Sequence, residues 1–417
     1  MTDIAGQPTR VSALLRERDY MAFWLSRVAG GLSYTIQSVT LGWLTYDIAR
    51  RTHSIEQSAL YVGLIGFCTF LPMFVLALPA GQIADRHERK HIMIACGVSA
   101  MALNTLLASA ALFGFASIPL FFGIAFLLGI SRVLRAPAGT ALAPMLVPRE
   151  LLPRAIAFNS LSNQTATIMG PALGGLLIAV SPWVAFSACV AFDLAGVALI
   201  ALIKRTTKPQ AQPGSRLELI KEGLRYIWTN KVVFGSISLD LFAVLLGSVG
   251  ALLPVFARDV LPTKGPEIFG LLRSSPAVGA MIAALTLANH PIRRHAGPKM
   301  LAAVAVYGLA TLIFAFSRLF WLSALALALV GASDMLSVFV RQTLVQLMTP
   351  DHMRGRVAAV STLFISASND LGEFESGIAA RILGPIGAAI FGGVGSLLVT
   401  GSWAKLFPAL RKADRLE

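Results

Sequence analysis

A chain of 417 residues is long enough for two or three soluble domains, but 56% of its residues are hydrophobic and only 13% are charged. Its mean hydropathy of +0.71 is far above that of soluble proteins. The composition therefore excludes an ordinary soluble protein and indicates an integral membrane protein. The formal net charge of +14 raises nucleic-acid binding as an alternative.

Apolar runs of about 20 residues or more, each long enough to span a hydrocarbon core roughly 30 Å thick as a helix, recur along the whole chain. The first 20 residues lack a short apolar core followed by a small-residue cleavage site, so we expect no cleavable signal peptide. The sequence predicts an all-α protein with twelve membrane helices, at residues 23–48, 58–80, 91–115, 118–146, 155–180, 183–203, 232–260, 267–288, 299–317, 320–349, 356–380 and 384–407.

Basic residues gather in every second loop between these helices. They are dense at residues 86–90, 204–231 and 293–299, whereas the opposite loops hold few, chiefly Arg50, Arg51, Arg258 and Lys264. The positive-inside rule therefore predicts that both termini lie in the cytoplasm. Because the basic residues form no single patch, we expect no nucleic-acid partner.

The longest polar interval separates six expected helices from six. We therefore predict an N-terminal six-helix bundle at 1–203, a cytoplasmic linker at 204–231 and a C-terminal bundle at 232–417. The end of the linker repeats apolar residues at helical spacing, which favours an amphipathic helix along the inner membrane surface, and a solvated connector helix fits equally well.

An internal repeat relates the two halves. Residues 129–175 align with 331–377 at a constant offset of 202 without gaps, so that Gly129 meets Gly331 and Gly175 meets Gly377. Under the same offset Arg132 corresponds to Asp334. Six-plus-six repeats are a transporter architecture with the substrate path between the halves.

The stretch GQIADRHERK resembles the cytoplasmic loop motif of the major facilitator superfamily, Gly-x-x-x-Asp-Arg-x-Gly-Arg-Lys. Glu88 stands where the motif has its second glycine, so the local turn departs from the motif. We expect the matching residues to form a conformational switch, whereas a set of ordinary cytoplasmic charges is the alternative. The matching residues are Gly81, Asp85, Arg86, Arg89 and Lys90.

Two further patterns narrow the resemblance. MGPALGG resembles the helix 5 motif of proton-driven exporters, with Gly170, Pro171, Gly174 and Gly175. The alternative is that these glycines only allow close helix packing. The stretches SASNDLGEFESG and FGGVGSLLVTGSWAKLFPALRKADRL resemble the enterobactin-exporter-like branch, also called transmembrane secretion effectors. The resemblance covers essentially the whole chain and implies proton-driven export.

Ionisable and aromatic residues inside membrane helices are candidates for the substrate site. Helices 1, 4, 7 and 10 line the central cavity in the superfamily's architecture. Arg132 and Arg135 share one face of helix 4 near mid-membrane and suit an anionic ligand. An ion pair that holds the halves together is the alternative for Arg132. The expected substrate-binding residues are Arg27, Tyr34, Arg132, Arg135, Phe242, Phe339 and Arg341.

Buried carboxyls with an arginine in reach can carry protons, because burial and a nearby cation act oppositely on their proton affinity. We expect proton coupling to use Asp240 and Asp334 first, with Asp370 and Glu373 in helix 11 as further members. Two more acids are less suited: Asp47 lies near a helix end, and Asp193 has no evident partner.

The sequence favours a proton-coupled exporter of a small amphipathic molecule, most concretely a siderophore-type or aromatic anion. A multidrug pump for hydrophobic cations is the runner-up, and a passive channel or lipid scramblase is the alternative of another class. No phosphate-binding loop or catalytic motif occurs, so we expect no enzyme activity. The isolated Cys68, Cys96 and Cys189 predict neither disulfides nor zinc, and we expect a monomer without cofactor or metal.

Overall fold

The computed structural model describes residues 11–205, 216–290, 292, 294–350 and 353–413. These residues form helices and no strands, so the expected all-α membrane fold is confirmed. Nine helices in the described ranges are long and apolar enough to cross a membrane. The count of twelve membrane helices stays a prediction. Residues 206–215 of the expected linker lie outside the described part.

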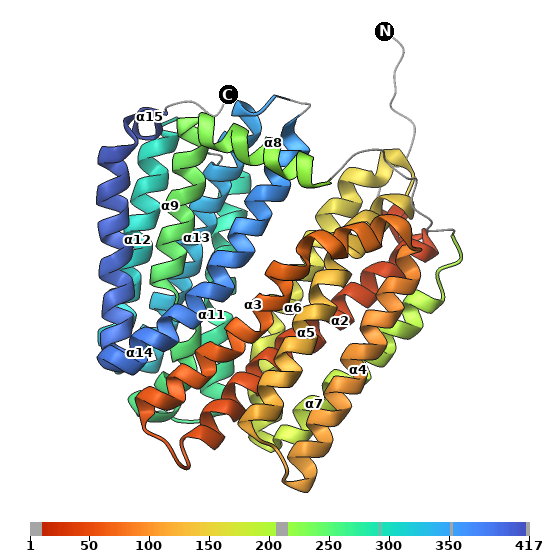
Figure 1. The fold of residues 1–417 in the computed structure, drawn as a ribbon, viewed down its shortest axis with the longest axis vertical. Coiled ribbons are helices and arrows are strands. Elements are labelled where there is room, and N and C mark those ends of the chain that lie inside the picture. The colour runs from red at the N-terminus through yellow and green to blue at the C-terminus, as the bar shows by residue number, and fades with distance from the viewer. Residues whose placement is uncertain (1–10, 206–215, 291, 293, 351–352, 414–417) are drawn as a thin grey trace.

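The N-terminal half consists of the helices from α2 to α7 (Figure 1). A short helix, α1, covers Val11–Leu15 before them. Four of the helices contain a proline, either internally or in the first turn. Apolar side chains of the bundle form two hydrophobic cores that hold its helices together. The helices are α2 (Arg18–Ala49), α3 (Ile55–Arg86), α4 (Arg89–Phe113), α5 (Ile118–Leu142), α6 (Leu152–Val180) and α7 (Pro182–Ala201).

The C-terminal half consists of the helices from α9 to α14. The chain after α9 bends through short turns, among them α10 (Leu253–Val255) and the π-helical turn η4 (Phe256–Val260). A short helix, α15 (Pro408–Arg411), ends the described chain. The longer helices are α9 (Lys231–Gly247), α11 (Pro266–Asn289), α12 (Ala296–Phe316), α13 (Phe320–Met348) and α14 (Arg354–Leu406).

Helix α14 contains a sharp reversal at Gly384, which divides it into two arms (Figure 1). Gly384 has a φ of 74°, a left-handed conformation that a residue with a Cβ rarely adopts. Pro385 follows and cannot donate to the preceding turn. Both arms pack closely against α9, and glycines make the close approach possible. A Cβ added at Gly372 or Gly392 would lie only 3.0 Å or 2.7 Å from a carbonyl oxygen of α9.

The two halves meet at one end of the molecule and diverge towards the end that carries α8 and α15 (Figure 1). We call these the closed end and the diverging end. Two pairs of glycines bring the halves together. A Cβ at Gly377 would lie 2.9 Å from the Cα of Gly63, and a Cβ at Gly175 would lie 3.0 Å from the Cα of Gly270. The closed end is therefore packed backbone against backbone.

The internal repeat is visible in the packing of α5 and α13. A Cβ at Gly129 would lie 2.5 Å from the Thr69 carbonyl oxygen of α3, and a Cβ at Gly331 would collide with the Pro276 carbonyl of α11. In each half, a glycine of one helix (α5 or α13) thus packs directly against the backbone of another (α3 or α11). This shared contact explains why the glycine recurs at an offset of 202 residues.

The charged turn at residues 81–90 joins α3 to α4. Helix α3 runs through Gly81 to Arg86, so the turn itself consists of His87 and Glu88. Arg89 donates to the Ala141 carbonyl at 2.9 Å, and Lys90 donates to the carbonyls of Ala201 and Ile203 at 2.9 Å and 2.6 Å. Both cations stabilise the carboxyl ends of α5 and α7, where orphan carbonyls and the helix dipole favour positive charge.

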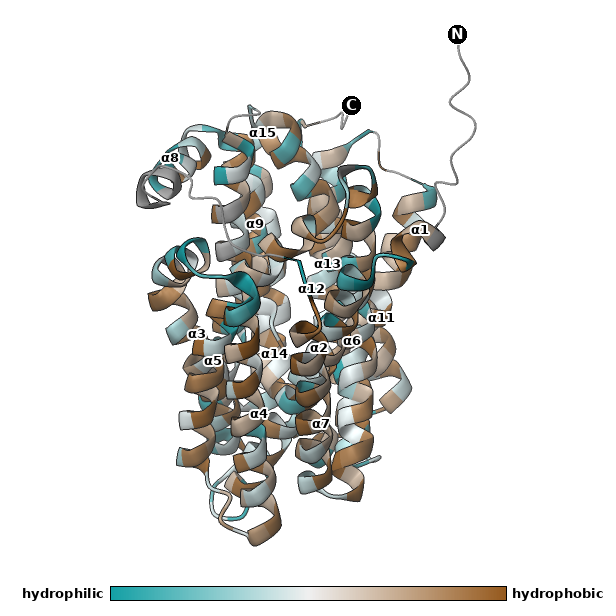
Figure 2. Ribbon diagram, turned by 90° about the vertical axis from the view of Figure 1, so that its right-hand side faces the viewer, coloured by the Kyte–Doolittle hydropathy of each residue, from teal (hydrophilic) through white to brown (hydrophobic). Residues whose placement is uncertain are grey.

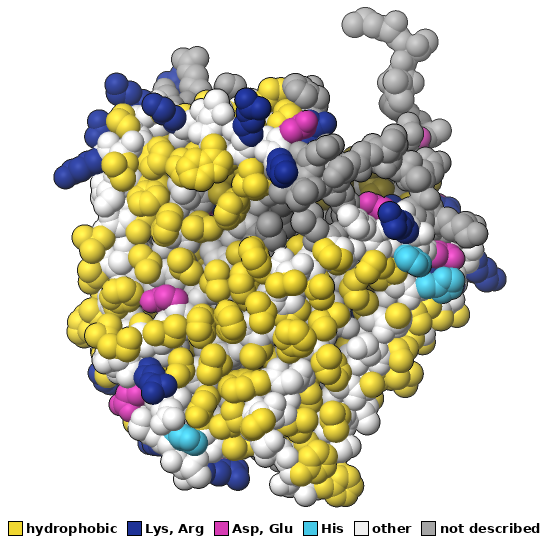
Figure 3. Space-filling model, in the orientation of Figure 1, with side chains coloured by type: hydrophobic (Ala, Val, Ile, Leu, Met, Phe, Trp, Pro, Cys, Tyr) yellow, Lys and Arg dark blue, Asp and Glu magenta, His cyan; other side chains and the backbone are white. Residues whose placement is uncertain are grey.

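Helix α8 (Arg216–Thr229) lies against the diverging end of the C-terminal half (Figure 1). Its Ile227 is buried in a core that α9, α13 and α14 complete, while Trp228 remains 68% exposed. Figure 2 shows hydrophobic residues along the full length of the bundle helices. The face drawn in Figure 3 is likewise largely hydrophobic, with Lys and Arg side chains concentrated at the diverging end.

Candidate functional site

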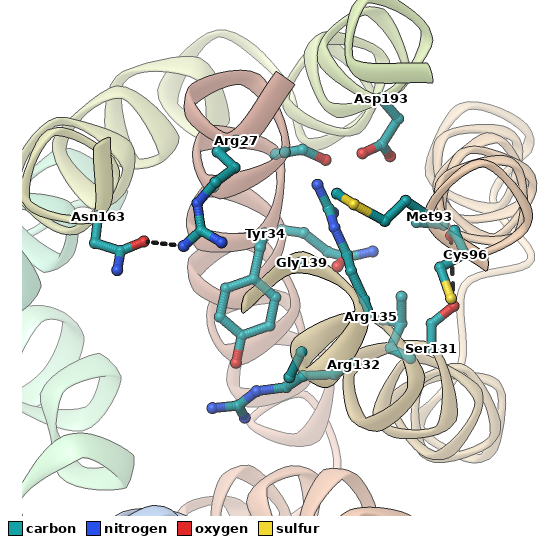
Figure 4. Close-up of a pocket in the computed structure, with 17 residues that line it drawn as sticks. Arg27, Tyr34, Met93, Cys96, Ser131, Arg132, Arg135, Gly139, Asn163 and Asp193 are labelled. Carbon is teal, nitrogen blue, oxygen red and sulfur yellow. Dashed lines mark hydrogen bonds between the residues drawn. The ribbon is translucent and has the colours of Figure 1, made fainter. Parts of the chain in front are cut away.

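A cavity of 310 Å³ lies within the N-terminal half, lined from α2, α4, α5, α6 and α7. Its charged lining is mostly basic: Arg27 from α2 and Arg132 and Arg135 from α5 (Figure 4). Tyr34 from α2 lies beside them. We call this the basic cavity. It brings together four of the residues that the sequence singled out for substrate binding.

The three arginines differ in how far their donors are satisfied. Arg27 donates to the Asn163 side chain at 3.0 Å, while its Nε is buried without a partner. The Arg135 guanidinium lies over Gly30, where a Cβ would collide with it. In the described residues Arg135 makes no hydrogen bond or ion pair. An arginine fork with free donors is suited to a carboxylate or another planar anion.

Arg132 links the basic cavity to the other half. Its NH1 lies 3.4 Å from Asp370 Oδ2 on α14, and its guanidinium carbon lies 5.3 Å from the centre of the Tyr34 ring, a cation–π distance. Under the repeat offset Arg132 corresponds to Asp334. The acid that pairs with Arg132 is Asp370, because α14 lies alongside the N-terminal half at the level of Gly66.

A chain of polar side chains supports the rear of the basic cavity. Gln37 Nε2 donates to Asn104 Oδ1 at 2.5 Å, and Asn104 Nδ2 donates to Asp193 Oδ2 at 2.7 Å. Asp193 thus has a partner that its sequence did not reveal, and it points towards the same space as Arg135 (Figure 4). The basic cavity is therefore lined by one acidic side chain and three arginines.

A second cavity, of 410 Å³, lies largely in the C-terminal half. We call it the acidic cavity. Asp334 from α13 and Glu373 from α14 line it, together with Arg273 from α11 and two polar residues of α6, Gln164 and Thr167. Arg273 NH2 lies 2.5 Å from Glu373 Oε1 and neutralises it. Asp334 lines the cavity and makes no hydrogen bond or ion pair with the described residues.

Behind Asp334 lies a fully buried ion pair. Arg341 NH1 lies 2.5 Å from Asp240 Oδ2, and the Arg341 side chain is only 1% exposed. A void of 10 Å³, about the space of one water molecule, borders Asp240, Asp334, Ser337 and Tyr307. Two Arg341 nitrogens and the Ser337 hydroxyl lack partners in the described residues. Such groups are the usual sites of an ordered water.

Ion pairs join the two halves at the closed end. Arg258 NH1 lies 2.6 Å from Asp47 Oδ1, and the Tyr46 hydroxyl donates to Asp259 Oδ2 at 2.5 Å. Arg50 approaches the same Asp259 oxygen at 3.4 Å. The π-helical turn η4 supplies both Arg258 and Asp259 to this cluster.

The remaining expected residues lie apart from the cavities. Phe242 packs its ring 5.4 Å from that of Trp403, and Phe339 packs against the apolar core formed by α9, α12 and α13. In the described part of the chain, neither residue lines the two cavities, nor does Arg341. In the helix 5 motif, Gly170 contacts Thr35, Gly174 contacts Ile36, and the Pro171 carbonyl contacts Gly270.

Sequence reasoning missed Arg273, Asn163 and the closed-end cluster. Arg273 was detectable as a lone charge in the apolar run of α11. The cluster had a signal too, because Arg50, Arg51 and Arg258 stand out in loops that are otherwise poor in basic residues. Acids near such exceptions to the positive-inside rule are candidate partners. Asn163 carried no comparable signal.

Comparison with known proteins agrees with this architecture. The chain is 29% identical over 377 residues to the enterobactin exporter EntS of Shigella boydii serotype 18, a match that covers 88% of this chain and 84% of the relative. The same exporter of Citrobacter koseri is 28% identical over 379 residues, with the same coverage.

Solved transporters share the fold. The POT family transporter PepTSo has a TM-score of 0.76 at 13% identity and covers 95% of this chain and 99% of its own. A bacterial homolog of the human lysosomal transporter Spinster has a TM-score of 0.68 at 15% identity, with coverage of 95% and 96%. The family described as transmembrane secretion effector matches residues 10–417. The chain is therefore a multi-pass membrane transporter, not an enzyme, and it belongs to the transmembrane secretion effector family of the major facilitator superfamily.

Proposed function

We propose that this transporter exports a siderophore-type or aromatic anion in exchange for protons. The observation that carries the proposal is the basic cavity, in which Arg135 and the Nε of Arg27 have no hydrogen-bond partner among the described residues and lie beside Tyr34. Arginine forks bind carboxylates or catecholates, and the tyrosine ring offers a face for stacking. The relatives named enterobactin exporters support a substrate of this chemical class.

We place the protein in the cytoplasmic membrane with both termini in the cytoplasm, on the strength of the basic residues in every second loop. The diverging end, which carries α8, then faces the cytoplasm, and the closed end faces outward. An anion from the cytoplasm would enter between the halves and reach the basic cavity. Because both cavities lie within one chain, a monomer suffices for this cycle.

For the proton we propose Asp334. Its carboxylate faces the acidic cavity without a partner, whereas Glu373 and Asp370 are each held by an arginine and Asp240 is held by Arg341. A water in the void beside Asp334 would connect it to Asp240. Asp240, Glu373 and Asp370 are then secondary members of the coupling network.

Arg132 offers a route from the substrate to the contact between the halves. An anion in the basic cavity would compete with Asp370 for the Arg132 guanidinium, since the existing pair is long at 3.4 Å and partly exposed. Displacement would break an ion pair that joins α5 to α14. Substrate binding would thereby be linked to the contact between the halves.

The decisive binding experiment uses Arg135→Ala. We expect a catecholate or aromatic carboxylate to bind the purified variant about 10- to 100-fold more weakly, the loss associated with a hydrogen bond to a charged group. Gly123→Ala is the matched control, since a Cβ there meets nothing within 4 Å. Unchanged affinity in Arg135→Ala would reject the basic cavity as the anion site.

The acidic cavity favours one other candidate, a pump for hydrophobic cations. Asp334 would then bind the substrate, and Arg135→Ala would leave cation affinity unchanged or raise it, because like charge is removed. Measuring anion and cation binding to the same variant separates the two functions.

Transport in sealed vesicles tests the coupling. Efflux should stop when the pH gradient is collapsed, whereas a channel or scramblase would continue. Asp334→Asn should bind substrate but no longer respond to the gradient. Export by Asp334→Asn that still follows the gradient would remove this residue from the mechanism.

A further inference from the structure

A third cavity lies on the C-terminal half, away from both cavities described above. It has a volume of 470 Å³ and is lined almost wholly by apolar side chains. Leu371, Ile378 and Leu383 come from the first arm of α14, Phe391 from the second arm and Leu245 from α9. We call it the α14 groove. It exists because the reversal at Gly384 folds the two arms of α14 onto α9.

The groove borders the membrane-facing surface. Its rim residues remain exposed: Ile382 by 74%, Leu383 by 52% and Phe391 by 44%. Figure 3 shows that acidic side chains are rare on the hydrophobic face of the molecule. A ligand reaching these residues would come from the bilayer rather than from water.

The groove contains a single charged residue, Glu375. Its Oε2 atom is buried and has no hydrogen-bond partner in the described part of the chain. Glu375 differs in this from Asp370 and Glu373 on the same helix, which each pair with an arginine. An unpaired carboxyl costs free energy in an apolar site, so a donor that supplies the missing bond is stabilised there.

We propose that the α14 groove binds a lipophilic amine that enters from the bilayer. Its hydrocarbon part packs on Ile378, Ile382 and Phe391, and its nitrogen donates to Glu375 Oε2. An amine that arrives as the free base takes the proton of the Glu375 carboxylic acid, and the resulting ammonium and carboxylate remain paired. The proton moves from the carboxylic acid to the amine, and the net charge of the site does not change. This site is independent of the proposed anion export.

The test uses the full-length protein in phosphatidylcholine nanodiscs with two photoreactive probes, a diazirine-bearing dodecylamine and the dodecanol of the same length. Mass spectrometry of the peptides spanning residues 371–391 measures labelling. We expect the amine to label the groove about tenfold more than the alcohol, and Glu375→Gln to reduce amine labelling to the level of the alcohol. Glu150→Gln, at an exposed acid outside the bundles, is the control.

Phe391→Trp provides a second variant that keeps the carboxyl and fills the groove. It should also lower amine labelling, and thermal unfolding establishes that each variant is folded. Equal labelling by the two probes, or unchanged labelling in both variants, would overturn the proposal. Replacement of phosphatidylcholine by phosphatidylethanolamine should leave labelling intact. Its loss would assign the groove to a lipid headgroup and overturn the free-amine site.

Discussion

The fourth helix of each half has the same packing but opposite charge. Gly129 of α5 and Gly331 of α13 press onto the same part of their neighbouring helices. One turn further along, Arg132 stands in the first half where Asp334 stands in the second. The repeat therefore preserves the contact that sets the distance between helices. The charge of the side chain at the adjoining cavity position differs between the halves.

The two halves also differ in how their buried arginines are paired. The C-terminal half holds Arg341 and Arg273 in short ion pairs. Among the described residues of the N-terminal half, Arg27 donates only to an amide and Arg135 to no group. A paired charge contributes to the fold, and an unpaired one is available to a ligand. Substitutions that remove the partner of a charge, or that move an unpaired charge, test this comparison.

The largest effect is expected for Asp240→Asn. It leaves the Arg341 charge buried without its counter-charge, which typically costs about 3–5 kcal/mol of stability. Thermal or denaturant unfolding of the purified protein measures the loss. The double variant Asp240→Leu, Arg341→Leu should recover much of it, since an apolar pair needs no counter-charge. A single variant as stable as the wild type would show that the pair is dispensable.

The contact between the halves at the closed end is the next target. Gly175→Val would drive side-chain atoms into the Pro266 carbonyl, 2.5 Å from the ideal Cβ position. Overpacking of this kind costs about 1–3 kcal/mol, and here it falls only on the conformation in which the halves touch. Spin-label distances across the closed end should therefore lengthen. An unchanged distance distribution would show that the contact does not bias the conformations.

A smaller effect is expected for Gly30→Ala. The added methyl group would displace the flexible Arg135 guanidinium rather than backbone, so folding should be little affected. Anion affinity should fall by about tenfold or less, because the donor is misplaced but not removed. Isothermal titration against Gly123→Ala measures the difference. A loss of stability equal to the loss of binding would point to general damage.

The smallest effect is expected for Asp370→Asn. It frees Arg132 from a long, partly exposed pair worth about 0.5–1 kcal/mol, so anion affinity should rise by roughly two- to fivefold. An increase would support competition between substrate and Asp370. A decrease would mean that Asp370 orients Arg132 for the ligand.

Hydropathy was enough to predict the all-α membrane fold, because each long apolar run satisfies its backbone only as a helix. The grouping of Arg132 with Arg135 also followed, since helical spacing places both on one face of α5, whereas Arg27 was placed with them through the resemblance to the superfamily. These inferences depend on local geometry. Local geometry is what a sequence specifies most directly.

Contacts between the halves were harder to predict. The repeat offset relates Arg132 to Asp334, but a symmetry relation does not give the depth at which α14 meets α5, and Arg132 reaches Asp370 instead. Phe242 and Phe339 lie on helices that have apolar residues on every side, so periodicity does not show which face turns to a cavity. Asp193 had no partner in the sequence, because Asn104 approaches it only in the folded bundle.

The glycine pairs at the closed end bear on the entropy of transport. Gly63 meets Gly377 and Gly175 meets Gly270 through backbone atoms alone. Side chains that become ordered at an interface lose up to about 2 kcal/mol each in rotamer freedom, and glycine has none to lose. At these glycine pairs closure therefore orders no side chains, whereas the ion pairs of Arg50 and Arg258 at the same end do require ordered side chains. The glycine pairs thus hold the halves together without the entropic cost that larger side chains would add.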